Sequence, residues 1–384
     1  MGDKIMDDDS MKKVMTFTSG NFVFSSKHHV DELRRTVFEA MLLYTTIADL
    51  PVLPEWSSYL EEELIRRSIY STAALEGNPL KEEEVGKIIG QKEGPQKEGE
   101  AKQAIVNLKK VYDYVKTIKQ TTEHPILTEG FIREVHGIIT ADLDYPGNLP
   151  GKYRDHTVRV GDHEHGGVYT PPKCRADIET LMKEFVEWIN SKEVVELDSL
   201  IRASLAHYHL GLIHPFGNGN GRTIRIVEAM LLRASGIKYV PTMLSNYYYR
   251  KMDEYYRAFS LARKNPEHDV TVFLKFMLEG VIDSLKEIKD SVTFRIRLLV
   301  MRDYYALLKS RKLITHRQHD LVCMLLDARE GTVSLKGLFD ISPYKALYRN
   351  VSERTARRDL YKLASLGILN LEGDHYRLDI KTLG

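Results

Sequence analysis

Cysteine is nearly absent from the chain, which has only Cys174 and Cys323 among its 384 residues. Two cysteines so far apart in the sequence argue against a disulfide framework and against a cysteine zinc site. No stretch approaches the roughly 18 consecutive apolar residues that a membrane helix needs. The opening residues, MGDKIMDDDSMKKV, also lack the apolar run of a signal peptide. We therefore expect a soluble, cytoplasmic protein that does not enter a membrane.

Neither sign of charge prevails over the whole chain. There are 55 Lys and Arg residues against 54 Asp and Glu, for a formal net charge of +1. This balance removes any whole-chain argument for binding to nucleic acid or to a membrane surface. The balance is uneven, however, because residues 311–384 hold 13 Lys and Arg against 9 Asp and Glu. The pattern indicates a mildly basic C-terminal module.

Apolar residues recur at helical spacing through most of the chain and predict a mainly α-helical protein. Residues 1–20 are polar and mixed in charge, so we expect a leader without fixed structure. The charged, glycine-containing run 91–100 predicts a surface loop, and VRVGDHEHGGVY at 158–169 predicts a small β-hairpin. Helices are predicted over 30–50, 61–78, 101–118, 127–139, 174–190, 198–211, 220–235, 248–263 and 268–289.

The C-terminal residues change in character. A predicted helix near 314–328 is followed by a short strand, two helices and a β-hairpin, which indicates a separate small domain. Segment 352–380 resembles a winged helix-turn-helix domain. That resemblance implies either a helix that enters the major groove of DNA or a module for protein contacts. Ser352 is placed to cap this helix, and its exposed basic residues would be Arg354, Arg357, Arg358 and Lys362.

The most informative run is HLGLIHPFGNGNGRTIRIVEAMLL at 209–232. An apolar helix ends at His214, and a loop with three glycines leads into a second helix. Glycines allow backbone N–H groups to face an anion closely, and a helix N-terminus adds partial positive charge. Arg222 and Arg225 lie three apart, on one face of that helix. A histidine at the loop entrance has a pKa that suits a general base. The run predicts a polyphosphate site beside an activated nucleophile.

At this point the chain resembles the Fic-domain family, whose signature reads H-P-F-x-(D/E)-G-N-G-R-x-x-R. Residues 214–225 match every specified position except 218. Further segments over about 60–280 also resemble the family, among them SIYSTAALEGNPL at 68–80 and PGNLPGKYRDHTVRVG at 146–161. The resemblance implies a Fic-type helical bundle with a β-hairpin flap. It also implies a transferase that moves AMP from ATP onto a Ser, Thr or Tyr hydroxyl of a target protein, which could be the enzyme itself.

The resemblance also implies a role for each motif residue. His214 would deprotonate the target hydroxyl, and Phe216 would anchor the loop in the core. Residues 244–256, LSNYYYRKMDEYY, resemble the adenine-side helix of the family, so Lys251 and Tyr256 would lie on the adenine side. The nucleotide phosphates would be held by Gly219, Asn220, Gly221, Arg222, Thr223, Ile224 and Arg225.

Position 218 departs from the family pattern. Relatives usually carry Asp or Glu there to hold Mg²⁺ on the phosphates, whereas this chain has Asn218. An amide oxygen can ligate Mg²⁺ but brings no charge, so we expect weakened Mg²⁺ binding. Two alternatives therefore stay open. The Fic core could be weak or inactive within a DNA-binding regulator, or it could transfer another nucleotide or phosphocholine.

Residues 72–77, TAALEG, resemble the inhibitory motif of the family, (S/T)-x-x-x-E-(G/N). The resemblance implies that Glu76 pairs with Arg225 and denies the nucleotide its phosphate partner, because a carboxylate competes with phosphate for the same arginine fork. We divide the chain into a leader and helical region at 1–58, a Fic catalytic domain with its inhibitory helix at 59–290, and a linker helix with the winged helix at 291–384. A second copy of the chain, in a homodimer, is a further candidate partner.

Overall fold

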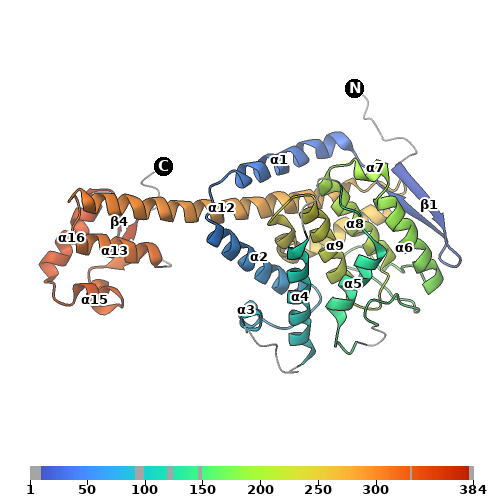
Figure 1. Cartoon of the computed structure of the whole chain (residues 1–384), viewed down its shortest axis with the longest axis horizontal. Coiled ribbons are helices and arrows are strands. Elements are labelled where there is room, and N and C mark those ends of the chain that lie inside the picture. The colour runs from blue at the N-terminus through green and yellow to red at the C-terminus, as the bar shows by residue number, and fades with distance from the viewer. Residues whose placement is uncertain (1–9, 91–98, 119–123, 146–148, 329–330, 380–384) are drawn as a thin grey trace. The chain divides into compact units, whose positions relative to one another are not determined.

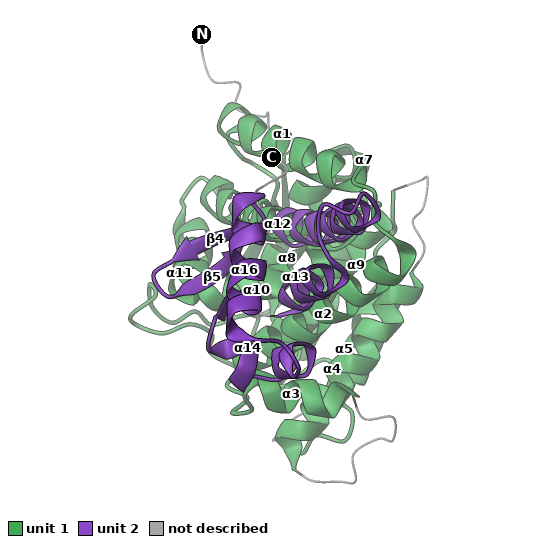
Figure 2. Cartoon of the chain, turned by 90° about the vertical axis from the view of Figure 1, so that its left-hand side faces the viewer, with its two compact units in different colours: residues 1–288 green, residues 289–384 purple. Residues whose placement is uncertain are grey.

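The computed structural model describes residues 10–90, 99–118, 124–145, 149–328 and 331–379. Most of the predicted loop at 91–100 and the start of the segment at 146–161 lie outside these ranges. The chain divides into two compact units, residues 1–288 and 289–384 (Figure 2). As expected, the protein is mainly helical with small antiparallel sheets. Among the described residues, no helix is both long and apolar enough to cross a membrane.

Unit 1 contains most of the helices (Figure 1). Side chains cap two of them as sequence preferences suggest: Thr128 accepts a hydrogen bond from the Phe131 N–H, and Asp198 accepts one from the Leu200 N–H. The elements of unit 1 are α1 Val30–Ala48, α2 Pro54–Ala74, α3 Glu82–Gly90, α4 Glu100–Thr117, α5 Glu129–Thr140, α6 Arg175–Ile189, α7 Lys192–Val195, α8 Ser199–Ile213, α9 Asn220–Ala234, the 3₁₀ helix η2 Val240–Thr242, α10 Leu244–Arg250, α11 Met252–Lys264 and the first part of α12 Thr271–Ser310.

Helices α8 and α9 form the centre of unit 1. Helix α8 packs against α9 and α6, and α9 also packs against α4 and α5 (Figure 1). The α8 sequence SLIRASLAHYHLGLI has no polar face, and its residues Leu200–Ile213 are all buried. A helix that is buried on all sides is held by its neighbours and not by its own propensity. The loop between α8 and α9 is therefore fixed at both ends by the core.

The N-terminal residues depart from the prediction. An unstructured leader over residues 1–20 is wrong for the described part, because β1 Met11–Met15 and β2 Asn21–Ser25 form an antiparallel hairpin. The reason is a buried carboxylate on α6. Asp177 accepts hydrogen bonds from the backbone N–H groups of Phe17 and Thr18, at 2.7 and 3.1 Å. This polar anchor fixes the hairpin turn onto α6.

Two helix predictions also need correction. The single helix expected over 248–263 is two helices, α10 and α11, because Lys251 leaves helical geometry at φ −118° and ψ 39°. The helix expected over 268–289 is the 40-residue α12, which begins in unit 1 and ends in unit 2.

Unit 2 is built from the end of α12 and the elements that follow it. Their order is the predicted one, with one additional short helix after the first strand. The three strands form an antiparallel sheet in the order β3-β5-β4. Thr315 and Gln318 form a capping box on α13, and Ser352 caps α16 as predicted. These elements are α13 His316–Asp327, β3 Thr332–Ser334, α14 Gly337–Asp340, α15 Tyr344–Tyr348, α16 Glu353–Ser365, β4 Leu369–Glu372 and β5 His375–Leu378.

Candidate active site

The motif loop connects α8 to α9 through two left-handed residues. His214 ends α8 with φ 49°, and Gly219 precedes α9 with φ 74°. Glycine adopts this region freely, but a residue with a side chain requires support from its surroundings. The strained histidine is therefore a position that other residues must hold.

Arg154 provides that support. Its Nε donates to the His214 carbonyl oxygen at 2.9 Å, and its Nη1 donates to the carbonyl of His156 at 2.7 Å. The Arg154 backbone N–H also donates to the carbonyl of Pro215 at 3.0 Å. Burial lowers the pKa of Arg154 to about 10, so it stays charged at neutral pH. Sequence reasoning missed this residue, because an arginine in a glycine-containing loop resembles a surface residue.

His136 on α5 was also missed, and it holds the middle of the loop. Its ring stacks on Phe216 with centroids 3.7 Å apart and planes 4° from parallel. Its Nδ1 accepts from the Gly151 N–H, so its Nε2 carries the proton and donates to the Asn218 carbonyl oxygen at 2.9 Å. Phe216 is buried, as predicted. The loop is thus clamped from two other segments of unit 1.

Asn220 has a structural part in the same loop. Its side-chain oxygen accepts from the Phe216 N–H at 2.9 Å, and its side-chain nitrogen donates to the Phe216 carbonyl at 2.8 Å. Its side chain therefore holds the loop together, while its backbone N–H lies at the start of α9.

A cavity of about 430 Å³ opens at the loop. His214 is half-buried in its wall. Burial and the charge of Arg154 lower the pKa of His214 to about 4, against the opposing charge of Glu76. The imidazole is therefore neutral at physiological pH and can accept a proton. The residues around the cavity are Leu75, Glu76, Val160, Gly161, Asp162, Gly211, His214, Gly217, Asn218, Gly219, Asn220, Gly221, Ile224, Arg225, Tyr255, Tyr256 and Phe259.

The N-terminus of α9 faces this cavity without a side-chain cap. Gly219 precedes the helix and has no side chain, so the first N–H groups of α9 are left for a ligand. A helix N-terminus of this kind favours an anion. Of the predicted phosphate residues, Thr223 does not line the cavity; its N–H donates to Gly219, and its buried hydroxyl has no hydrogen-bond partner among the described residues.

Glu76 lies between the α9 N-terminus and α2. The predicted ion pair is present, with Arg225 Nη2 donating to Glu76 Oε1 at 2.8 Å. Thr72 accepts two further hydrogen bonds from Arg225, through its hydroxyl and its carbonyl. Burial opposes ionisation of Glu76, but the charges of Arg225 and Arg222 outweigh it, so the pKa of Glu76 lies below its usual value. A Cβ on Gly221 would overlap this carboxylate.

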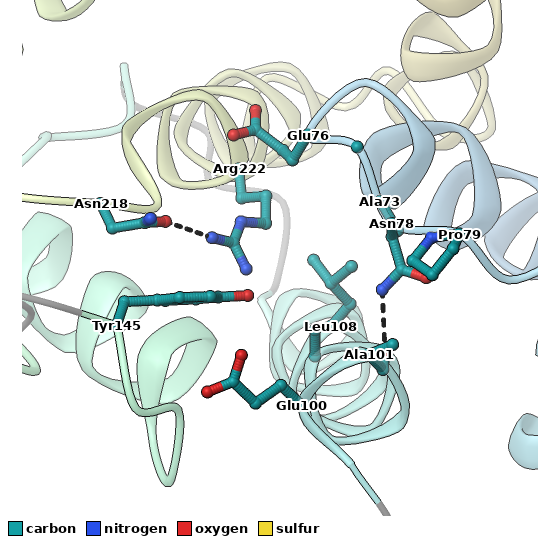
Figure 3. Close-up of a pocket in the computed structure, with 12 residues that line it drawn as sticks. Ala73, Glu76, Asn78, Pro79, Glu100, Ala101, Leu108, Tyr145, Asn218 and Arg222 are labelled. Atoms are coloured by element: carbon teal, nitrogen blue, oxygen red, sulfur yellow. Dashed lines mark hydrogen bonds between the residues drawn. The ribbon is translucent and has the colours of Figure 1, made fainter.

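A second cavity of about 300 Å³ also has Glu76 in its wall (Figure 3). Arg222 lines it, so the two motif arginines face different cavities. Arg222 Nη2 donates to Asn218 Oδ1 at 2.7 Å, while its buried Nε finds no acceptor in the described part of the chain. The guanidinium lies 5.7 Å from the centre of the Tyr145 ring. Glu76 and Asn218 line both cavities.

The two residues predicted on the adenine side lie in different places. Tyr256 lines the first cavity, but Lys251 does not. Lys251 is exposed and donates to Glu254 at 3.1 Å, because the break between α10 and α11 directs it to the surface. The predicted flap hairpin is reduced to one antiparallel bridge between Val160 and Tyr169, whose N–H···O bonds measure 2.8 and 2.7 Å.

Comparison with known proteins agrees with the motif. Residues 126–232 match the model of the Fic/DOC family. "Protein adenylyltransferase Fic" of Aedes aegypti is 28% identical over 220 residues, which are 57% of this chain and 40% of that protein. The Drosophila erecta protein of the same name is 34% identical over 129 residues, 34% of this chain and 23% of that protein. The chain therefore spans less than half the length of these relatives.

Solved structures show the same fold. A Fic family protein from Desulfovibrio desulfuricans aligns with a TM-score of 0.55 at 20% identity, over 92% of this chain and 97% of that one. Fic-1 from Caenorhabditis elegans aligns with a TM-score of 0.53 at 21% identity, over 68% of this chain and 72% of that one. The family match and the motif together identify residues 126–232 of this chain as a Fic domain.

Proposed function

We propose that the chain is a protein adenylyltransferase that transfers AMP from ATP to a Ser, Thr or Tyr hydroxyl of a protein, including its own. One observation carries the proposal: the neutral ring of His214 and the uncapped N-terminus of α9 line the same cavity. A base and an anion site side by side are what transfer of a phosphoryl-type group to a hydroxyl requires. The names of the curated relatives support the same reaction.

In the proposed reaction, the hydroxyl oxygen attacks the α-phosphorus of ATP. The bond from the α-phosphorus to the bridging oxygen breaks, and pyrophosphate leaves. His214 accepts the hydroxyl proton, because its ring is neutral at physiological pH. The N–H groups at the start of α9 and the Arg225 guanidinium stabilise the negative charge of the phosphates. Tyr256, in the cavity wall, covers the adenine ring of ATP.

We further propose that the described state is the inhibited one. Glu76 occupies the Arg225 fork that a phosphate would otherwise bind. The Glu76 carboxylate is ionised at neutral pH because its pKa is lowered, and it would repel an incoming polyphosphate. Loss of this carboxylate should free the Arg225 guanidinium, whose N–H groups are donors suited to phosphate oxygens.

The family resemblance implies Mg²⁺ on the phosphates, held by an acidic residue at position 218. The residues present do not provide that ligand: position 218 is an amide, and its oxygen already accepts from Arg222. Over the described ranges, no group of three or more His, Cys, Asp or Glu residues could hold a metal ion. No step of the proposed reaction is therefore assigned to a cation.

The proposal is tested by intact-mass spectrometry of the Glu76→Gly protein after incubation with ATP. We expect the mass of one or more AMP groups on Glu76→Gly and much less on wild type. The double variant Glu76→Gly/His214→Ala should bind ATP but transfer AMP about 10²- to 10⁴-fold more slowly, the usual contribution of a general base. Equal labelling of the single and double variants would remove His214 from its role. Label from γ-labelled instead of α-labelled ATP would identify a different transfer.

A second activity is proposed for unit 2 on a separate observation. Arg354, Arg357, Arg358 and Lys362 are all exposed on α16, the helix preceding the β4–β5 hairpin. This order of elements supports a winged-helix module whose α16 enters a DNA major groove. Specific retention of duplex DNA on a filter, weakening steeply as salt rises, would support this activity.

A further inference from the structure

We propose that Asn218 binds a phosphate oxygen through its amide NH₂ group, so that the polyphosphate is held without a divalent cation at this position. The inference rests on the proposed function, because it concerns the same phosphate site. It assigns Asn218 a ligand of opposite charge to the one that the family pattern implies. The carbonyl oxygens of Asn218 would otherwise be the atoms offered to a metal ion.

The orientation of the Asn218 amide follows from its neighbour. Arg222 Nη2 lies 2.7 Å from Asn218 Oδ1 (Figure 3). A guanidinium has only donors and no acceptor, so the amide oxygen, and not the nitrogen, must face it. Within the described ranges no hydrogen bond joins Asn218 Nδ2 to another protein group. The NH₂ group is therefore the part of the side chain left for a ligand, at a residue that lines both cavities.

The backbone oxygen of Asn218 is engaged in the same way. The Nε2–H group of His136 donates to it at 2.9 Å, and this tautomer is fixed because Nδ1 accepts from Gly151. Both oxygens of Asn218 thus already accept from protein donors. A hard cation such as Mg²⁺ is usually bound through carboxylates and phosphates, and Asn218 offers it neither a charge nor an unengaged oxygen.

The local field also favours an anion. Two guanidinium groups, of Arg222 and Arg225, lie beside Asn218 and Glu76, and the N-terminus of α9 adds its partial positive charge. Glu76, the carboxylate that lines both cavities, is itself paired with Arg225. Once a phosphate displaces Glu76 from Arg225, the cavity offers it three kinds of donor: the α9 N–H groups, the Arg225 guanidinium and the Asn218 amide, all of which line it.

The test measures binding and not transfer. Calorimetry would follow ATP and, separately, inorganic tripolyphosphate, binding to full-length Glu76→Gly protein in EDTA and in Mg²⁺. We expect dissociation constants that agree within about twofold between the two conditions. Adding Asn218→Ala should weaken binding about tenfold in both, the loss of one hydrogen bond to a charged group. Adding Asn218→Asp should weaken binding at least about tenfold in EDTA, with recovery in Mg²⁺, because the new carboxylate repels phosphate until a cation joins them.

The matched control is Asn370→Asp, the same charge change at an exposed position of β4 in unit 2, which should alter neither constant. The inference is overturned if Mg²⁺ strengthens binding tenfold while Asn218 is present, or if Asn218→Ala leaves binding in EDTA unchanged. Tripolyphosphate keeps the two proposals distinguishable. If the binding constants are as expected but the mass assay finds no AMP on the protein, only the proposed function is contradicted. If AMP is transferred, but strictly in proportion to Mg²⁺ binding at Asn218, only this inference is contradicted.

Discussion

The arginines around the motif loop of unit 1 and those on α16 of unit 2 carry the same charge in opposite surroundings. Arg154, Arg222 and Arg225 are 3–4% exposed, and each donates to named oxygens of the protein. Arg354 and Arg358 on α16 are exposed to solvent. A buried guanidinium must find acceptors for its N–H groups, because an unpaired buried charge is strongly destabilising. Buried arginines therefore fix geometry, while exposed ones supply charge to a partner.

This difference explains how each region can act. In unit 1, Arg154 holds a strained turn and so determines where the His214 ring lies. Arg225 is held by hydrogen bonds to Glu76 and Thr72. In unit 2, Arg357 makes one exposed ion pair along its own helix, with Glu353, and such pairs contribute little to stability. Substitutions should therefore alter folding in one region and charge alone in the other.

The largest effect is expected at Arg154. Arg154→Met keeps most of the volume but removes the buried donors to the carbonyls of His214 and His156, which then lose these hydrogen bonds. We expect the free energy of unfolding to fall by about 3 kcal/mol. Urea denaturation of the full chain would measure it. Arg159→Met is the matched control, because Arg159 is exposed in the same segment and should change stability by less than about 0.5 kcal/mol. Equal losses in both variants would show that burial does not separate the two kinds of arginine.

Arg154 also marks where prediction from sequence ended. The motif residues 214–225 could be found because they are consecutive in the sequence. The left-handed turn at Gly219 could be expected because glycine adopts a positive φ freely. The ion pair between Glu76 and Arg225 could be expected only from the family resemblance. The support from Arg154 could not be predicted, because its partner His214 lies 60 residues away. No local pattern distinguishes an arginine that folds inward from one that stays in solvent.

The N-terminal hairpin failed prediction for the same physical reason. Residues 10–20 have the composition of a solvated segment, and their order depends on Asp177, which follows about 160 residues later. The Lys251 prediction failed for a different reason: the single helix expected over 248–263 is interrupted between α10 and α11, and Lys251 lies exposed at that break. Helices with strong apolar periodicity could be located from the residue pattern itself, and long-range polar contacts could not.

A smaller loss of stability is expected as pH falls. It extends the comparison of buried and exposed side chains from arginine to histidine. Burial lowers the pKa values of His136 and His209 to about 4, whereas the unfolded value is about 6.5. As pH falls below 7, the unfolded chain takes up protons that the folded chain does not, so stability falls. Between pH 7 and pH 6 the two residues together should remove about 1.4 kcal/mol of stability.

This pH slope is measured by thermal or urea unfolding at each pH. The double variant His136→Gln/His209→Gln should lose most of the slope, while His375→Gln, at an exposed position of unit 2, should keep it. His214, whose pKa is also lowered to about 4, should still supply about a third of the original slope, and a larger remainder in the double variant would mean that other groups govern the pH dependence. An equal flattening by His375→Gln would show that exposed histidines contribute as much as buried ones, against the comparison.

The smallest effect on stability is expected on α16. Because the Arg357 and Arg358 side chains are exposed, replacing both with Ala should change the free energy of unfolding by less than about 0.5 kcal/mol. The same variant should bind duplex DNA more weakly, with a log–log salt slope reduced by about 1 for each phosphate that it no longer neutralises. Filter binding of the full chain over a range of salt concentrations measures that slope. A large loss of stability would mean that these arginines also fix the geometry of the fold. An unchanged salt slope would mean that Arg357 and Arg358 do not contact DNA phosphates.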